Sequence, residues 1–195
     1  MRKTILIAAA GAALCAASTN AQLIDNSPGN GSFEVGGLLG GLEDWTAFGN
    51  VSQSFDFASD GIASAKVFGG FGGDSVFFQD IFPIAPGDEV RATIKALTPD
   101  GDSIAGTQNQ FRIALVFLDP TRPDAANTWD VGNTFLDGAT VTSDMDGTFN
   151  GVDDFVGEVV GTAPYNTSGV QFVGVFLQPD FEGGAVWLDE VLVEV

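Results

Sequence analysis

Short runs of Val, Ile, Phe and Thr alternate with Gly, Asp, Asn and Pro from residue 22 to the end of the chain. No segment keeps helical periodicity for more than about two turns, so the pattern predicts strands instead of helices. Numerous short strands without crossover helices favour an antiparallel β-sandwich. We expect strands at 31–35, 45–50, 52–57, 64–69, 75–81, 89–97, 110–119, 155–162, 170–178 and 185–195. We expect a loop with a weak hairpin from Pro120 to Asp154.

Two of these strands show which of their faces belongs in the core. The apolar faces consist of Val90, Ala92, Ile94 and Ala96 in the first, and of Phe111, Ile113, Leu115 and Phe117 in the second. Because alternate residues of a strand point to opposite sides, Arg91, Lys95 and Arg112 point away from the core. We expect these three basic side chains to gather on one outer face.

The last strand carries a carboxylate on its more apolar face. That face consists of Ala185, Trp187, Asp189, Val191, Val193 and Val195. A buried carboxylate without a partner costs several kcal/mol. We therefore expect Asp189 to accept backbone N–H bonds, to pair with Arg or Lys at the sheet edge, or to bind a metal ion.

Residues 1–21 have the features of an export signal that is removed. Arg2 and Lys3 precede an apolar stretch too short for a membrane span, and small residues precede a cleavage site after Ala21. The single cysteine, Cys15, lies inside this segment and follows Leu14, which argues against lipidation. No second apolar run of membrane length follows. We expect residues 22–195 to form one soluble domain that is secreted, either extracellular or periplasmic.

The charge of the chain restricts its partners. Its formal net charge is −19, and without Arg2 and Lys3 the remaining 5 basic and 26 acidic residues give −21. Such a surface repels nucleic acid and attracts cations. The chain has 0 histidines and one tyrosine, Tyr165, which excludes His-ligated zinc and Ser-His-Asp triads. The predicted domain also has no cysteine, so core packing or a metal must stabilise it.

Several motifs resemble a known family when they are taken in order. They are Asn-Gly-Ser-Phe-Glu at 30–34, Trp45, and the segments 59–67, 76–81, 84–97 and 183–195. Together they resemble the carbohydrate-binding modules of the CenC type, within the galactose-binding-like jelly rolls. Val90 replaces an aromatic residue of the family pattern, and Glu190 replaces an aspartate. The resemblance implies a β-sandwich of the jelly-roll type that binds a glycan and performs no catalysis.

The resemblance also implies a structural calcium ion at the edge of the sandwich, where the first and last strands lie side by side. Glu34 and Asp189 would share the ion, and carbonyl oxygens near Ser32 and Gly61 would add ligands. Calcium takes 6–8 oxygen ligands, so carboxylates and carbonyls suit it. A second acidic stretch, 143–155, lacks the spacing of an EF-hand, and we interpret it as a solvated hairpin.

In the same family a groove on one sheet face holds the glycan. Candidates for lining it are Arg91, Lys95, Arg112 and Gln171, although simple solvation would also explain their outward position. Trp129, in a polar loop, either stacks on a ligand or anchors its loop. We expect Trp45 to pack inside and the 17 phenylalanines to fill the core.

The sequence thus predicts a secreted glycan-binding protein that recognises a polysaccharide or a cell-surface glycan and contains structural calcium. The alternative is a structural or adhesive exoprotein without sugar specificity. An enzyme is disfavoured, because Tyr165 is a poor base for a lyase and no spacing singles out a carboxylate pair for a glycosidase.

Overall fold

The computed structural model describes residues 22–24, 29–37, 42–69, 73–119, 121, 130–141, 155–180 and 182–195. The predicted export signal therefore lies outside the described residues, as do Trp129 and most of the acidic stretch at 143–155. Among the described residues no helix is long and apolar enough to cross a membrane.

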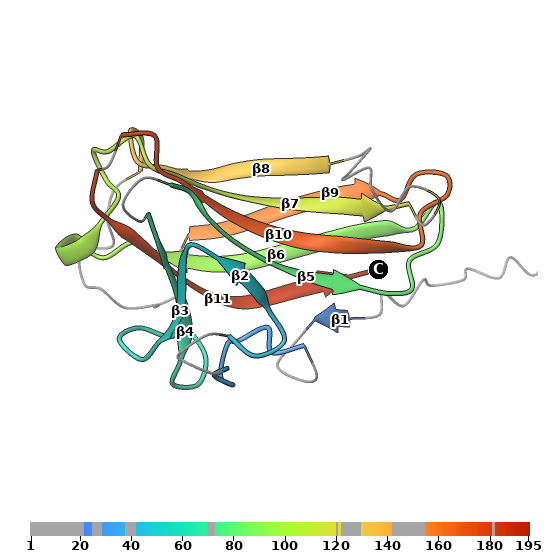
Figure 1. Ribbon diagram of the computed structural model, residues 1–195, viewed down its shortest axis with the longest axis horizontal. Helices are drawn as coiled ribbons and strands as arrows, with labels where there is room; N and C mark the ends of the chain where they lie inside the picture. Colours follow the sequence, from blue (N-terminus) through green and yellow to red (C-terminus); the bar gives the residue numbers. More distant parts are fainter. Residues whose placement is uncertain are drawn as a thin grey trace, which may run out of the picture.

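The chain forms two antiparallel sheets that face each other, as the sequence predicts (Figure 1). The first sheet has the order β3–β4–β11–β6–β9, with β1 also paired to β11; its strands are β1 (Gln22–Ile24), β3 (Asn50–Ser54), β4 (Ser64–Phe68), β6 (Glu89–Leu97), β9 (Phe155–Thr162) and β11 (Ala185–Glu194). The second sheet has the order β2–β5–β10–β7–β8; its strands are β2 (Thr46–Phe48), β5 (Ser75–Ile81), β7 (Gln110–Leu118), β8 (Asp130–Asp137) and β10 (Gly169–Leu177). A 3₁₀ turn at Asp100–Asp102 is the helical element of the described residues.

The inner faces of both sheets supply one continuous core. The two apolar faces predicted for β6 and β7 are buried in it, which confirms those predictions. Trp45 is also buried, as predicted, and its indole Nε1–H donates to the carbonyl of Asn30 at 3.0 Å. Phe33, Phe77 and Phe172 pack around the Trp45 ring, with centroids 5.3–6.0 Å from it.

Two strand predictions are wrong. Residues 31–35 form a turn instead of a strand, because the Asn30 side chain bonds the backbone of Val35 and Glu43, and Phe33 takes a φ of 57°. In the segment expected to be a loop with a weak hairpin, β8 pairs with β7 from Asp130 to Asp137. Gly132 and Asn133 weaken the strand pattern of β8 in the sequence, so pairing with a strongly apolar neighbour determines its conformation.

An irregularity in β11 changes which residues share a face. The pairing with β6 shifts between Asp189 and Leu192, and Glu190 has a φ of 51°. Leu188 before the shift and Val191 after it both belong to the core between the sheets. Trp187 and Asp189 therefore point to the outer side of the first sheet, where Trp187 packs with Phe57. The expectation that Asp189 shares a face with Val191 is wrong.

Candidate functional site

The buried carboxylate Asp189 is held by backbone N–H groups of the segment between β3 and β4. Its side chain is 0% exposed. Asp189 Oδ2 accepts hydrogen bonds from the backbone N–H of Ser59 at 2.7 Å and of Asp60 at 3.0 Å, and Oδ1 accepts one from Glu190 at 2.8 Å. Burial raises the pKa of Asp189 from 3.8 to about 6, although the three N–H bonds oppose that rise.

The Glu34 carboxylate also accepts backbone N–H bonds from this segment, a few residues further along the chain. Its Oε1 accepts hydrogen bonds from the backbone N–H of Ile62 and of Ala63, both at 2.9 Å. Gly61 has a φ of 67°, and a Cβ added there would collide with the Glu34 carboxylate. Two carboxylates, from residues 155 positions apart, thus bracket the turn at 59–63. We call Glu34, Asp189 and this turn the carboxylate clamp.

The clamp region also contains hydroxyl groups without partners. The Oγ atoms of Ser32 and Ser59 are buried and make no hydrogen bond within the described residues. The neighbouring carbonyl of Gly31 accepts a bond from Val191 N at 2.8 Å, which places Ser32 close to the end of the β11 irregularity. Within the described residues no group of three or more His, Cys, Asp or Glu side chains could hold a metal. An ion here would need hydroxyl or carbonyl oxygens besides the two carboxylates, and those are ligands that calcium accepts.

The four strand residues predicted to line one glycan groove lie on opposite sides of the sandwich. Arg91 and Lys95 belong to β6 of the first sheet, whereas Arg112 on β7 and Gln171 on β10 belong to the second. The prediction of a single shared face is therefore wrong. Alternation along a strand identifies the outward side of that strand, but it does not identify the sheet in which the strand lies.

On the outer face of the first sheet, cross-strand ion pairs engage the basic side chains. Arg91 contacts Glu158 on β9 at 2.8 Å and Glu194 on β11 at 3.7 Å, and Lys95 pairs with Glu190. The Glu158 partner raises the pKa of Arg91, and the Arg91 guanidinium lowers the pKa of Glu158. These charges neutralise one another, so the described residues of this face offer a ligand no surplus of positive charge.

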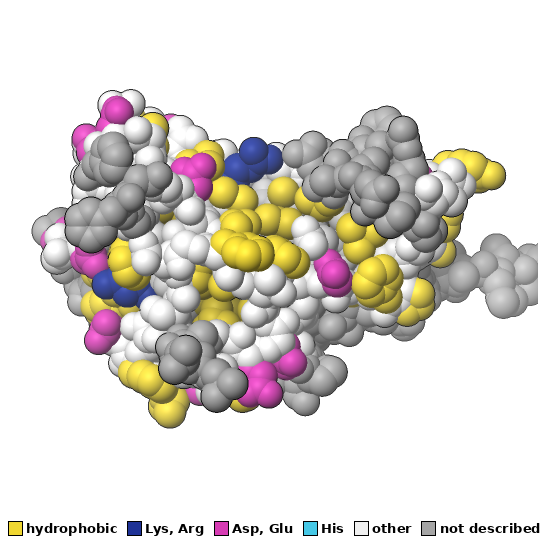
Figure 2. Space-filling view, viewed as in Figure 1, with side chains coloured by type: hydrophobic (Ala, Val, Ile, Leu, Met, Phe, Trp, Pro, Cys, Tyr) yellow, Lys and Arg dark blue, Asp and Glu magenta, His cyan; other side chains and the backbone are white. Residues whose placement is uncertain are grey.

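The outer face of the second sheet is different, because it is largely apolar and carries an exposed aromatic pair. Phe48 on β2 is 60% exposed, and its ring lies nearly parallel to that of Phe78 on β5, with the centroids 6.2 Å apart and an interplanar angle of 27°. Two adjacent rows of paired outward residues cross the sheet: Phe48, Val76, Val175, Arg112 and Thr134, and then Thr46, Phe78, Val173, Ala114 and Gly132. We call these two rows the aromatic face. Figure 2 shows hydrophobic side chains gathered over β5 and β10 on this side.

Polar groups with planar geometry lie within the aromatic face and on the row next to it. The Arg112 guanidinium lies over Gly132 on β8, where an added Cβ would collide with it. On the next row Gln171 Nε2 donates to Asp80 Oδ1 at 2.8 Å. A flat apolar surface flanked by guanidinium, amide and carboxylate groups suits a ligand with apolar ring faces and equatorial hydroxyls.

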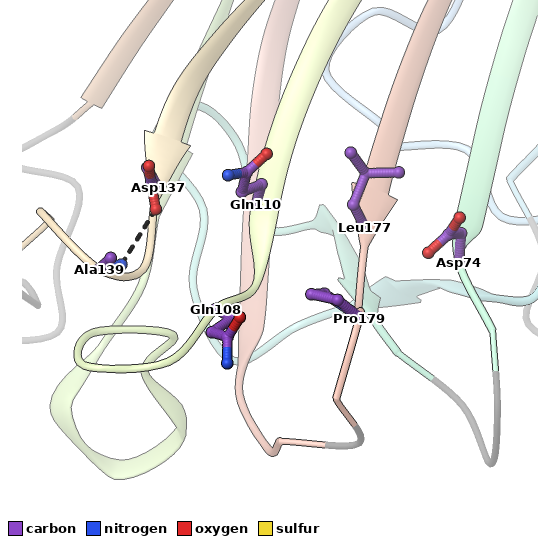
Figure 3. Close-up of a pocket in the computed structure, with 7 residues that line it drawn as sticks. All are labelled: Asp74, Gln108, Gln110, Asp137, Ala139, Leu177 and Pro179. Carbon is purple, nitrogen blue, oxygen red and sulfur yellow. Dashed lines mark hydrogen bonds between the residues drawn. The ribbon is translucent and has the colours of Figure 1, made fainter.

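A groove lies at the end of the second sheet where β7 begins and β10 ends (Figure 3). Its volume is about 530 Å³, and its lining consists of Asp74, Gln108, Gln110, Asp137, Ala139, Leu177 and Pro179. A second pocket of about 550 Å³ adjoins it and shares Gln110 and Asp137. We call the first of these the end groove.

Sequence reasoning missed both Phe48 and Phe78, because it assigned every phenylalanine to the core. Phe48, Phe55 and Phe82 are each more than half exposed, so that assignment is wrong for them. In β5, Phe77 faces the core and Phe78 faces outward, and two adjacent apolar residues hide the alternation that would distinguish them. In the strand expected at 45–50, alternation from the buried Trp45 would have placed Phe48 on the outer face, whereas its position beside Phe78 follows only from the pairing of β2 with β5.

The chain matches no protein-family model and no curated protein. Similar solved structures are more numerous. A cyclase from Fischerella sp. TAU has a TM-score of 0.60 at 12% identity, covering 90% of this chain and 97% of the cyclase. The CBM22-1 xylan-binding domain from Paenibacillus barcinonensis Xyn10C has a TM-score of 0.53 at 15% identity, covering 89% of this chain and 94% of that domain.

The enzymatically active domain of bacteriophage CBA120 tailspike protein 4 is also similar, with a TM-score of 0.55 at 13% identity. The match covers 84% of this chain but only 21% of the tailspike chain. Further carbohydrate-binding modules are among the matches. At these identities the likeness shows a shared jelly-roll β-sandwich, and it extends both to carbohydrate-binding modules and to proteins named as enzymes.

Proposed function

We propose that this protein binds a glycan on the aromatic face and performs no catalysis there. The observation that supports this most is the exposed Phe48 ring stacked beside Phe78 on a largely apolar surface, with Arg112 in the same row as Phe48 and Gln171 on the row beside Phe78. Phenyl rings stack on the apolar faces of pyranoses, and planar polar groups bond pairs of hydroxyls. The similarity to a xylan-binding domain and to a module solved with β-1,4-galactotriose favours a polysaccharide ligand.

The charge of the chain narrows the class of glycan for this face. With a net charge of −19, the protein repels polyanions at long range. The aromatic face itself is lined mainly by uncharged side chains. A neutral polysaccharide such as a xylan or a galactan therefore fits this face better than an acidic one.

A binding screen over neutral polysaccharides tests the proposal, using affinity electrophoresis followed by titration calorimetry. Replacing Phe48 or Phe78 by Ala should weaken binding about 5- to 30-fold, since loss of one stacking ring costs roughly 1–2 kcal/mol. Phe55→Ala is the matched control, because Phe55 is 66% exposed but follows β3 of the other sheet. Equal losses in all three variants, or no binding to any polysaccharide, would favour the alternative of an adhesive protein without sugar specificity.

We further propose that calcium binds at the carboxylate clamp, where Glu34 and Asp189 would be its carboxylate ligands and oxygens near Ser32 and Gly61 would complete the shell. The buried carboxylate of Asp189 supports a cation at this position, as do the hydroxyls of Ser32 and Ser59, which have no partner within the described residues. Bound calcium would fix the turn at 59–63 against β11 and thereby stabilise the fold without touching the ligand.

Thermal unfolding in EDTA and in millimolar calcium tests the calcium site. Calcium at about a hundred to a thousand times its dissociation constant should stabilise the native state by roughly 3–4 kcal/mol. Asp189→Ala should abolish the difference between the two buffers. Equal midpoints for the unmodified protein would contradict the site, and the glycan screen would be unaffected by that outcome.

A further inference from the structure

The end groove is lined by two carboxylates, whereas the two rows of the aromatic face contain none. It crosses four adjacent strands, from Asp137 at the end of β8 to Asp74 just before β5 (Figure 3). Three interstrand spacings of about 4.8 Å give it a length of roughly 14 Å. An elongated ligand of several linked units would fit this dimension.

Each end of the groove presents a carboxylate that is already fixed in place. Asp74 Oδ1 accepts the backbone N–H of Gln178 at 3.0 Å, and Asp137 Oδ1 accepts that of Ala139 at 3.1 Å. These bonds hold the side chains, while the second oxygen of each carboxylate accepts no hydrogen bond from the described residues. Both carboxylates are therefore oriented acceptors that a donor group of a ligand could reach.

Between the two carboxylates the lining is part amide and part apolar. Asp180 accepts a hydrogen bond from Gln108 Nε2 at 2.7 Å, and Glu182 accepts one from the Gln108 backbone N–H at 2.5 Å. These two bonds hold Gln108 in place. The Gln110 side chain makes no hydrogen bond within the described residues and lies beside Leu177 and Pro179. Apolar groups can contact sugar ring faces, and the Gln110 amide can bond hydroxyls.

The charged side chains described around the end groove are all acidic. The described lining contains two carboxylates and no Lys or Arg, and Asp180 and Glu182 lie behind Gln108. The nearest outward basic residue on β7, Arg112, lies two positions further along the strand, roughly 7 Å from Gln110. The groove therefore attracts cationic groups and repels anionic ones.

We propose that the end groove binds a short oligosaccharide that carries amino groups. Its ammonium groups would bond Asp74 and Asp137 at the two ends, and its rings would lie over Leu177 and Pro179 with hydroxyls on Gln110. Charge-assisted hydrogen bonds to fixed carboxylates are stronger than neutral ones. This site uses different residues from the aromatic face, so either site can be disproved without the other.

Titration calorimetry with two matched tetrasaccharides tests the proposal. One is the β-1,4-linked glucosamine tetramer in a buffer that keeps its amines protonated, and the other is the same tetramer with every amine acetylated. The charged tetramer should bind at least about tenfold more tightly, and added salt should weaken it because salt screens exposed charges. Spermine, a linear polyamine without sugar rings, is the third ligand and should bind more weakly than the charged tetramer.

Three isosteric variants locate the site. Asp74→Asn and Asp137→Asn should each weaken the charged tetramer about two- to fivefold, the range expected for one exposed charged contact. Asp88→Asn is the matched control, because Asp88 also accepts a backbone N–H, that of Ala85 at 2.8 Å, but lies at the opposite end of the sandwich. Asparagine keeps an acceptor for each backbone bond, so the three variants should melt alike.

Several outcomes would overturn the proposal. Equal affinity for the acetylated and the charged tetramer would show that ammonium groups are not recognised. Equal losses in Asp74→Asn and Asp88→Asn would show attraction by net charge alone. Spermine binding as tightly as the charged tetramer would assign the groove to polyamines instead of sugars.

Discussion

The pH dependence of stability at Asp189 follows directly from its environment. The perturbation is Asp189→Asn, which keeps the shape of the side chain but removes its titration. Burial raises the pKa of Asp189 from 3.8 to about 6 in the folded protein. The folded state therefore holds the proton more tightly than the unfolded state does, and stability contributed by this group decreases as the pH rises from about 4 to about 6.

The size of this effect follows from the difference between the two pKa values. One pKa unit corresponds to about 1.4 kcal/mol, so the rise from 3.8 to about 6 corresponds to roughly 3 kcal/mol. In EDTA, the free energy of unfolding of the unmodified protein relative to Asp189→Asn should fall by up to that amount between about pH 4 and about pH 7. The pH-dependent contributions of exposed ion pairs such as Arg91–Glu158 cancel in this comparison, because both proteins contain these pairs.

Urea unfolding, followed by tryptophan fluorescence at several pH values, measures this difference. The same series in millimolar calcium provides the contrast, since a bound cation favours the ionised carboxylate and should reverse or remove the decline. A difference between the two proteins that stays constant from about pH 4 to about pH 7 in EDTA would refute the argument. Such a result would mean that the N–H bonds from Ser59, Asp60 and Glu190 fully offset the burial of the charge.

Three further predictions concern single contacts. Gly61→Ala should lower the free energy of unfolding by more than about 1 kcal/mol in denaturant titrations, because the residue has a φ of 67° and its new Cβ would collide with Glu34. An unchanged free energy of unfolding would show that the carboxylate clamp accommodates the Cβ. Replacing both Arg91 and Lys95 by Ala should leave the melting temperature and the glycan affinity nearly unchanged, since their ion pairs are exposed on the first sheet. Lost retention on an affinity gel would contradict this. Replacing Arg112 and Gln171 together by Ala should weaken retention about 5-fold or more at an unchanged melting temperature; unaltered retention would place the ligand elsewhere.

The strands and their inward faces could largely be predicted from the sequence. Strands 75–81, 89–97 and 155–162 agree with the prediction to the residue, and the apolar faces of 89–97 and 110–118 are buried. Alternation works well where one face of a strand is apolar and the other is polar. It also indicated that Asp189 is buried, and of the partners that it left open the structure contains backbone N–H groups, those of Ser59, Asp60 and Glu190.

The arrangement of the candidate site could not be predicted, for two physical reasons. Alternation does not say which strands are neighbours, so Arg91 and Arg112 were expected on one face although their strands lie in different sheets. The irregularity at Glu190 has no glycine to mark its positive φ, so the change of face after Asp189 is invisible in the sequence. The aromatic face in turn depends on the pairing of β2 with β5 across 26 intervening residues, and no local pattern encodes that contact.

Mapping of backbone amide chemical shifts during titration with the best-bound polysaccharide fragment tests the central claim most directly. The account predicts that the largest changes fall on β2, β5, β10 and β7, around Phe48, Phe78 and Arg112, while the amides of β6 and β9 stay unperturbed. Changes concentrated on β6 and β9, around Arg91 and Lys95, would contradict the assignment of glycan binding to the aromatic face.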